Sequence, residues 1–378
     1  MKKNYFMLAA AALMFAACAQ FDTVNEVPES EPQAIGFDTY AQMTTRAASN
    51  SGQGYTWNLD DHHSNFYVWG YKDVSDTYVF NAKEVSHNGS AWNYTGTVYW
   101  DKAANDYEFY AAAPATGGVW TLNANTDAKN DDYFTTSQLE IKAHNAAKAD
   151  DHKYKESFKG VTNAVDYMIA EPKNVETANF GNTVQLDFIH ILSRLNITVS
   201  KASTLSGQTV TMNSLEIHNV KNIGSFNENA TISNGTLVGG TYDRWIPAAN
   251  HTTYQALTDE VIAVKPTAPE KPEYMLQALV MPQLAEYENT IKLDGTGASS
   301  TSAPYFTISY TIDDGINPAE SFKATYNLAD AFNGDTSNGL YFSEGWQNTL
   351  NITITPTKID FSGKVAEWGG GDNGLDID

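Results

Sequence analysis

Short runs in which apolar and polar residues alternate recur along nearly the whole 378-residue chain. A period of two places every second side chain on one face of a β-strand, whereas long stripes with helical spacing are scarce here. Tyr, Phe and Thr are plentiful within the runs, and turn residues such as Asn88-Gly89 and Asp314-Gly315 lie between them. The sequence therefore predicts an all-β protein of short antiparallel strands arranged in sandwiches. The expected strands are 35–43, 65–71, 76–80, 91–94, 97–100, 107–113, 166–170, 184–188, 195–199, 215–217, 273–280, 304–312, 322–328, 349–355, 359–361 and 364–368.

The length of the chain favours two domains of ordinary size. The alternation that ends at Phe188 breaks over 189–195 and resumes afterwards, so we expect the domain junction there, within about ten residues. This gives an N-terminal domain of residues 47–193 and a C-terminal domain of residues 194–378. The segment 126–159 is rich in Ala, Lys and Asp with little apolar pattern, and it reads as a long exposed insertion with at most a short helix.

The N-terminus has the layout of a secretory signal peptide over residues 1–17, with Lys2 and Lys3 before an apolar run that ends at Ala17. That run is too short to span a bilayer as a helix. The only cysteine of the chain, Cys18, follows at once, in a setting that resembles the lipobox of bacterial lipoproteins, where this cysteine is lipidated. An ordinary secretion signal beside an incidental cysteine is the alternative. A single cysteine also excludes an intrachain disulfide.

Residues 18–46 follow as a segment before the first domain. Its start is acidic and contains Pro28 and Pro32, which predicts an extended tether. The strand 35–43 comes next, and then a stretch of small polar residues, 44–52, that should form an exposed loop. Arg46 lies in this loop and is one of three arginines in the chain. An exposed loop with one arginine suits a protease, although an incidental basic residue in a tether is the alternative.

The composition excludes several classes of function. A formal charge of -22 opposes binding to a nucleic-acid backbone. The sequence contains no GxSxG, phosphate-loop or HExxH motif, so we expect no enzyme and no cofactor. His62 and His63 lie beside two aspartates but lack ligand spacing, and the acidic turns 313–315 and 372–374 do not continue as calcium loops, so we expect no metal site. A solvated loop explains the histidines, and packing in the core explains His190.

Four features, in this order along the chain, resemble the fimbrillin family of Bacteroidales. They are the lipobox at Cys18, the strand Ile35-Gly-Phe37 followed by Thr45-Arg46-Ala47, the segment from Val184 to Leu195 that contains Leu186, Phe188, His190 and Leu192, and the ending Ile359-x-Phe361-(x)3-Val365-x-x-Trp368. Members of that family are subunits of type V pili. The resemblance implies two transthyretin-like β-sandwich domains in tandem, export as a lipoprotein, and maturation by an arginine-specific protease at the cell surface.

Carried over to this sequence, the resemblance implies proteolytic processing between Arg46 and Ala47. The cut would displace a strand whose apolar residues are Ile35, Phe37, Ala41 and Met43. An unpaired sheet edge beside an apolar groove would remain, and a strand from another subunit could fill it by β-strand addition. In this family the donor comes from the C-terminal region of a neighbour. The donor residues offered here are Ile359, Phe361, Val365, Trp368, Leu375 and Ile377.

The predicted function is therefore a structural subunit of a cell-surface pilus that mediates adhesion. The tail after the glycines 369–371 has only two apolar residues, a poor donor that suits a minor or tip subunit. The expected partners are other pilus subunits in a homo- or heteropolymer, the protease, surface glycans or proteins of host or bacteria, and the membrane through the lipid before maturation. The expected location is the outer membrane for the precursor and then the fimbrium. A surface glycan-binding outer-membrane lipoprotein is the alternative, because the eight tryptophans could stack on sugars.

Overall fold

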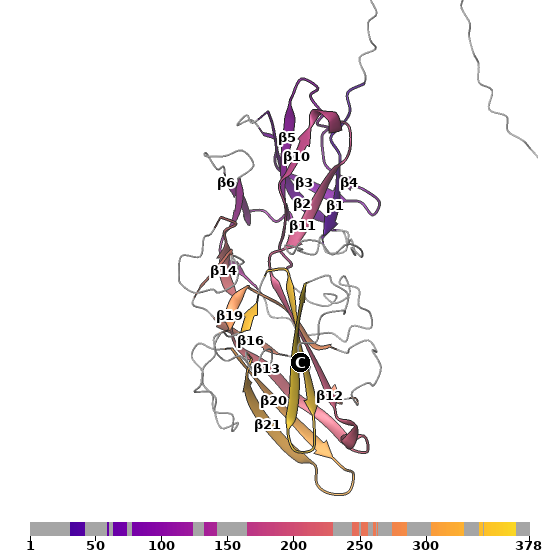
Figure 1. The fold of residues 1–378 in the computed structure, drawn as a ribbon, viewed down its shortest axis with the longest axis vertical. Helices are drawn as coiled ribbons and strands as arrows, with labels where there is room; N and C mark the ends of the chain where they lie inside the picture. The colour runs from indigo at the N-terminus through magenta and orange to yellow at the C-terminus, as the bar shows by residue number, and fades with distance from the viewer. Residues whose placement is uncertain are drawn as a thin grey trace, which may run out of the picture.

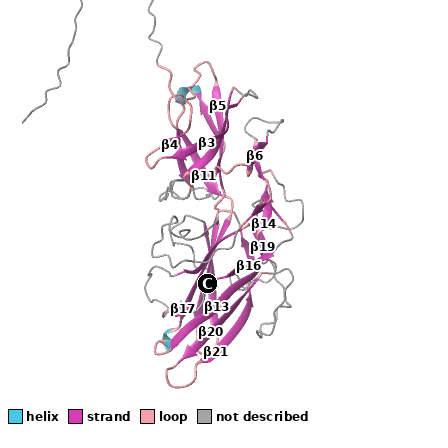
Figure 2. Ribbon diagram, turned by 180° about the vertical axis from the view of Figure 1, so that it is seen from behind, coloured by secondary structure: helices cyan, strands magenta, loops and turns pink. Residues whose placement is uncertain are grey.

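The computed structural model describes residues 31–41, 59, 63–73, 78–123, 132–141, 165–229, 244–248, 251–255, 260–261, 263, 274–285, 304–328, 340–342 and 344–367. These residues form β-strands and two short 3-10 helices, which are the cyan turns in Figure 2. None of the described helices is long and apolar enough to cross a membrane. The all-β prediction is confirmed. The strands are β1 (Phe37–Ala41), β2 (Asn65–Lys72), β3 (Tyr78–His87), β4 (Trp92–Asn93), β5 (Asp106–Ala113), β6 (Trp120–Asn123), β7 (Tyr133–Thr136), β8 (Leu139–Glu140), β9 (Met168–Ala170), β10 (Lys173–Glu176), β11 (Val184–His190), β12 (Ser193–Lys201), β13 (Thr209–Lys221), β14 (Ile223–Phe226), β15 (Trp245–Pro247), β16 (His251–Gln255), β17 (Glu260–Val261), β18 (Tyr274–Val280), β19 (Gln283–Ala285), β20 (Tyr305–Asp313), β21 (Glu320–Asn327), β22 (Leu340–Phe342), β23 (Trp346–Ile354) and β24 (Ile359–Glu367).

The first half of the chain forms an eight-stranded sheet in the order β1-β11-β9-β5-β2-β3-β4, with β10 also paired to β5. The inward side chains of these strands form one apolar cluster, which includes Phe66, Phe109 and Phe188. The sheet curls around this cluster, because residues just before β1 pair with residues just after β4. β1 therefore lies where the two ends of the curled sheet meet.

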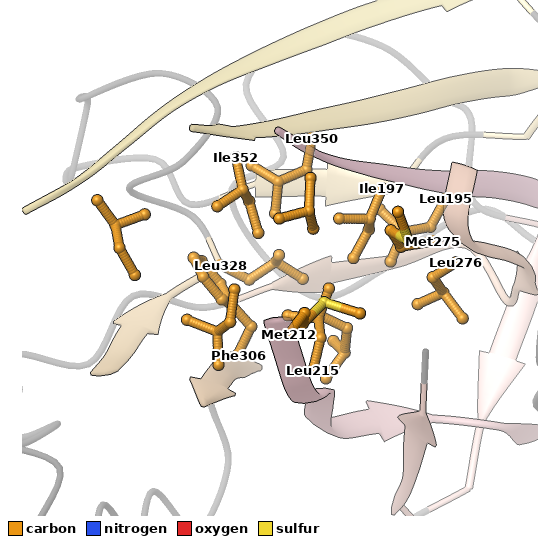
Figure 3. Close-up of a cluster of buried hydrophobic side chains, with 14 of the residues drawn as sticks. Leu195, Ile197, Met212, Leu215, Met275, Leu276, Phe306, Leu328, Leu350 and Ile352 are labelled. Carbon is orange, nitrogen blue, oxygen red and sulfur yellow. The ribbon is translucent and has the colours of Figure 1, made fainter. Parts of the chain in front are cut away.

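The second half forms a sandwich. A four-stranded sheet, β18-β12-β23-β24, faces a five-stranded sheet built on β16-β13-β20-β21, to which β17 adds. Figure 3 shows the side chains between them, with Ile197, Leu350 and Ile352 on one side and Met212 and Phe306 on the other. Figure 1 shows this half below the first in an elongated molecule, with the β20–β21 hairpin at the far end.

A third apolar cluster contains residues from both halves. Trp69, Phe134 and Tyr167 come from the first half, and Phe226 and Trp245 from the second. β8 also pairs with β14, which pairs with β15 on its other side, and this small sheet joins the halves through backbone hydrogen bonds. Residues 191–192 connect β11, in the eight-stranded sheet, to β12, in the four-stranded sheet. This connection lies next to the domain junction that the sequence predicts at residues 193–194.

Two features differ from the expectations. The insertion expected at 126–159 contains β7 and β8, and Phe134, Leu139 and Ile141 are buried there, so this part is not an exposed insertion. Alternation does not mark these strands, because β7 has four residues and β8 only two. Not every pairing is antiparallel either, since β1 pairs with β11 and β12 with β23 in parallel.

Candidate functional site

The segment that contains β1 is hydrogen-bonded on two sides. Before the strand, Ile35 donates its backbone N–H to the carbonyl of Val98 at 2.9 Å, and Trp100 donates to the carbonyl of Gln33 at 2.9 Å. The chain then crosses over, and the N–H of Val184 in β11 donates to the carbonyl of Gly36 at 2.8 Å. One short segment thus links the two ends of the curled sheet.

β1 runs parallel to β11 over five residues, from Phe37 opposite Val184 to Ala41 opposite Phe188. Parallel neighbours need a long connection, and 142 residues separate the two strands. β1 is at the end of the sheet order, so removing it would turn β11 into the edge strand. A newly exposed edge of this kind pairs readily with another strand.

The inward face of this segment is deeply buried. The exposed fractions of Ile35, Phe37 and Thr39 are 1%, 5% and 1%. Alternation in a strand places these three residues on the same side, facing the first apolar cluster. Burial of an aliphatic or aromatic side chain contributes about 1.5–3 kcal/mol, so Ile35 and Phe37 hold the segment in place mainly by packing.

Phe37 fills a socket made of four aromatic rings. Its ring centroid lies 5.3 Å from Phe80, 5.6 Å from Phe109, 6.0 Å from Tyr94 and 6.4 Å from Phe66. All four contacts are edge to face, the arrangement that aromatic pairs prefer, and each adds about 0.5–1.5 kcal/mol beyond burial. We call these four residues the Phe37 socket.

Tyr94 also holds the backbone of the segment. Its hydroxyl donates a hydrogen bond to the carbonyl of Ile35 at 2.7 Å. Burial raises the pKa of Tyr94, so the hydroxyl stays protonated and remains a donor at neutral pH. The site can thus bind an extended peptide through backbone hydrogen bonds on both sides and through a row of inward pockets.

The comparison with known families agrees with this architecture. Residues 45–368 match the family described as Fimbrillin-like. The chain belongs to the fimbrillin-like family. Membership supports a role as a structural fimbrial subunit in cell adhesion, and it is consistent with the absence of enzymatic activity that the sequence predicts.

Solved structures of fimbrial proteins are similar to this chain. A fimbrial protein from Bacteroides vulgatus matches this fimbrillin-like chain with a TM-score of 0.50 and 14% identity, over 89% of this chain and 99% of that one, which shows a shared fold. The tip fimbrial protein Mfa3 from Porphyromonas gingivalis, truncated at its C-terminus, matches with a TM-score of 0.39 and 10% identity, over 88% of this chain and 99% of that one. No curated protein sequence matches the chain.

Several residues that the sequence predicts for the site lie outside the described residues of this fimbrillin-like chain. They are Cys18, Met43, Arg46, Ala47, Trp368, Leu375 and Ile377. The structure places Ile35 and Phe37 on the inward face of the segment and Ala41 at the end of β1. The strand begins at Phe37 and not at the expected Ile35, and residues 42–43 lie outside the described residues.

Both described arginines are held by polar partners. Arg194 is buried in β12, and its Nε donates to the side-chain oxygen of Asn196 at 3.0 Å. Arg244 forms ion pairs of 2.7 Å with Glu344 and 3.3 Å with Glu228. Burial lowers the pKa of Arg244, but the two carboxylates outweigh it and raise the pKa overall. Arg194 lies within a strand, which does not offer the exposed loop that a protease needs.

Three of the six residues that the sequence predicts as a C-terminal donor, Ile359, Phe361 and Val365, lie in β24. This strand is at the edge of the four-stranded sheet and pairs with β23 over nine residues. Ile359 is buried at its start. Phe361 lies opposite Ile352, and Val365 lies opposite Asn348. β24 would have to leave β23 before it could serve as a donor.

His63 and His190 form a small polar cluster with Asp166 at the end of β11. The ring of His190 is buried, and its Nδ1 lies 2.8 Å from a carboxylate oxygen of Asp166. His63 lies 2.5 Å from the backbone oxygen of Asp166 and is partly buried, so the expectation of a solvated loop is wrong for this residue. Its neighbours 60–62 lie outside the described residues. Folding brings residue 63 beside residue 166, which local sequence could not indicate.

The acidic turn 313–315 binds its own backbone. The Asp314 carboxylate accepts the N–H of Ile316 at 2.8 Å and that of Asn317 at 2.7 Å, and these bonds lower the pKa of Asp314. Turn chemistry therefore accounts for this cluster. Within the described part of the chain, no three His, Cys, Asp or Glu side chains are grouped to hold a metal.

The aromatic side chains offer little for sugar stacking in the described ranges. Trp69, Trp92, Trp100, Trp120 and Trp245 are buried. The large apolar residues that are exposed in these ranges are Tyr99 at 50%, Ile246 at 54% and Ile316 at 88%. They lie on separate elements, so these ranges hold no row of exposed rings of the kind that a glycan platform needs.

Proposed function

We propose that this chain is a subunit of a cell-surface pilus that assembles by strand exchange after proteolysis. The observation that supports this proposal is the place of β1. The strand completes the first apolar core, yet it lies upstream of Arg46 in the chain. A single cut after Arg46 would therefore detach part of the core from the rest of the molecule.

Loss of the segment would open a site suited to another strand. The backbone groups of β11 and of residues 98–100 would lose their partners, and the Phe37 socket would face water. Exposed backbone and apolar surface are both costly. A strand from another subunit would restore the hydrogen bonds and the burial together, which is the basis of β-strand addition.

Delivery would use the lipid on Cys18. A lipidated precursor would be held at the outer membrane, because several acyl chains anchor far more firmly than one. An arginine-specific surface protease would then cut between Arg46 and Ala47. Since the lipid is attached to the discarded piece, the same cut would free the subunit for the fimbrium.

The donor would come from another pilus subunit, in a homo- or heteropolymer. β24 repeats the start of the β1 segment, since Ile359 and Phe361 have the spacing of Ile35 and Phe37. The tail beyond residue 368 has only two large apolar residues, Leu375 and Ile377, that could fill pockets in a groove. A subunit with a good acceptor and a weak donor suits a minor or tip position, from which it would adhere to glycans or proteins of host or bacterial surfaces.

The replacement Arg46→Ala tests the proposal in cells that carry the processing protease. We expect the variant to stay monomeric and lipidated, because its β1 cannot leave. Ala47→Ser keeps the arginine and serves as the matched control, and it should assemble as the wild type does. Assembly of Arg46→Ala at the wild-type level would refute the proposal.

A further inference from the structure

Ile316 lies in the turn that joins β20 to β21. The exposed fraction of its side chain is 88%, the highest among the large apolar residues that are exposed in the described ranges. β20 and β21 pair residue by residue as far as Ile312 opposite Glu320, so the turn is carried on a continuous hairpin. Figure 1 shows this hairpin at the far end of the elongated molecule. Ile316 is therefore presented at an end of the molecule, where another molecule can reach it.

The turn does not depend on Ile316 for its shape. The carboxylate of Asp314 accepts the N–H of Ile316 at 2.8 Å, and it accepts the N–H of Asn317 at 2.7 Å and the side-chain amide of that residue at 2.8 Å. Gly315 has a φ of +73°, in the left-handed region that glycine adopts without strain. The other residues between 313 and 318 are Asp, Gly, Asn and Pro, all of which turns favour. Turn chemistry therefore explains each of these residues except the isoleucine.

Two further apolar residues, Pro318 and Ala319, are exposed beside Ile316. We call residues 313–320 the hairpin tip. A single exposed apolar residue is common on protein surfaces and needs no explanation, but here three of them share one turn whose backbone is already fixed. A fixed loop loses little conformational entropy when it binds, so more of the energy of burial remains for affinity. The hairpin tip thus has the properties of a preformed binding loop.

The charge and composition of the hairpin tip indicate the kind of partner that it fits. Its residues include the carboxylates of Asp313, Asp314 and Glu320, and no lysine or arginine. Like charges repel, so the partner should carry basic groups around the site that receives Ile316. The formal charge of -22 makes a second copy of this chain a poor match. The hairpin tip also lacks an aromatic ring that could stack on a sugar, which favours a protein over a glycan.

We propose that the hairpin tip is an adhesion site, and that its partner is a protein surface with an apolar patch bordered by lysine or arginine side chains. Ile316 packs on the apolar patch, and the exposed carboxylates of Asp313 and Glu320 face the basic border. This inference rests on the adhesive role in the proposed function, but it does not depend on the exchange of β1. It assigns that role to the end of the second sandwich.

The test measures the binding of short fluorescent peptides to the purified full chain by fluorescence anisotropy. One peptide is an amphipathic helix of leucine and lysine, which presents an apolar stripe with a basic border. A leucine and glutamate helix changes the sign of the border, and a serine and lysine peptide of the same charge removes the stripe. We expect the leucine and lysine peptide to bind at least about tenfold more tightly than either of the others.

The replacement Ile316→Asn tests the residue that carries the proposal. Asparagine suits a turn and the isoleucine side chain is exposed, so the variant should unfold at the wild-type temperature. It should bind the leucine and lysine peptide at least about tenfold more weakly, because the burial of one aliphatic side chain is lost. Ile246→Asn is the matched control. Ile246 is also exposed, at 54%, but lies on β15, so this variant should bind as the wild type does.

Three results would overturn the inference. The first is an Ile316→Asn chain that binds the leucine and lysine peptide as tightly as the wild type. The second is equal binding of the serine and lysine peptide, which would show attraction by charge alone. The third is self-association of the wild-type chain that Ile316→Asn abolishes, since the partner would then be a second copy.

Failure of the proposed function would look different. Arg46→Ala would then assemble on cells as the wild type does, or no fibres would contain the chain. The purified chain would still bind the leucine and lysine peptide through Ile316.

Discussion

Phe37 of β1 and Phe109 of β5 meet edge to face, with ring centroids 5.6 Å apart and ring planes at 82°. Phe37 lies upstream of Arg46 and Phe109 lies downstream. The contact therefore connects the part of the chain that the proposed cut removes with the part that it leaves. The stability of the uncut chain and the affinity of the cut chain for a new strand therefore both depend on the Phe37 socket.

Replacing Phe37 tests how much that socket contributes. Phe37→Ala should lower the free energy of unfolding by about 3–5 kcal/mol, because a large buried ring is lost and a cavity is left among four others. Denaturant titration of the uncut chain measures this. Asp38→Asn on the exposed side of the strand keeps an oxygen to accept the N–H of Thr39, so it should change little. Equal effects of the two replacements would contradict the account.

Gly70 supports the socket from β2. A Cβ at this position would lie 2.9 Å from the ring of Phe109 and 3.1 Å from that of Phe80. Gly70→Ala should therefore destabilise the chain by about 1–3 kcal/mol through overpacking. Gly207→Ala, where no atom lies within 4 Å, is the control and should be close to neutral. Thermal unfolding of the two variants decides between these outcomes.

The Arg244 cluster should hold the two halves of the chain together. Glu228, which pairs with Arg244, also accepts the N–H of Phe134 in β7 at 2.9 Å. Burial raises the pKa of Glu344, and the charge of Arg244 opposes that rise. Glu344→Gln would remove one of two charged partners from the partly buried Arg244, which should cost about 1–3 kcal/mol.

The measurement is the free energy of unfolding in denaturant. Asp360→Asn removes an exposed ion pair with Lys358 and should leave stability unchanged. A Glu344→Gln chain as stable as that control would show that the cluster is dispensable.

The lowered pKa of His63 predicts that the folded chain loses stability in mild acid. Burial lowers the pKa of His63 below 6.5, and the nearby Asp166 offsets only part of this. A lowered pKa means that the unfolded chain binds the proton more readily. The stability from neutral His63 is thus complete above pH 6.5 and is lost as the pH falls from 6.5 toward the lowered value. His63→Gln should flatten the fall in stability between pH 7 and 5, and an unchanged slope would count against this assignment.

Much of the fold could be predicted because amphipathic strands leave a local signal. The strands expected at 65–71, 107–113 and 304–312 appear as β2, β5 and β20 with nearly the same bounds. β20 alternates buried and partly buried side chains along most of its length, and β2 and β5 begin with the same alternation before they become buried on both faces. A pattern of this kind depends little on the rest of the chain. β13, which spans 13 residues, was expected only at 215–217, because register shifts opposite its neighbours interrupt the alternation.

The pairing of the strands could not be predicted in the same way. Alternation shows which face of a strand is buried, but it does not show which strand lies beside it. The parallel pairing of β1 with β11 and the contact of residues 33–35 with 98–100 join distant parts of the chain.

The most direct test is the N-terminus of the subunit in assembled surface fibres, determined by mass spectrometry of purified material. The account predicts that the chain begins at Ala47 and that no fragment containing Ile35 or Phe37 remains with it. Fibres whose subunits still begin at lipidated Cys18 and retain β1 would contradict it.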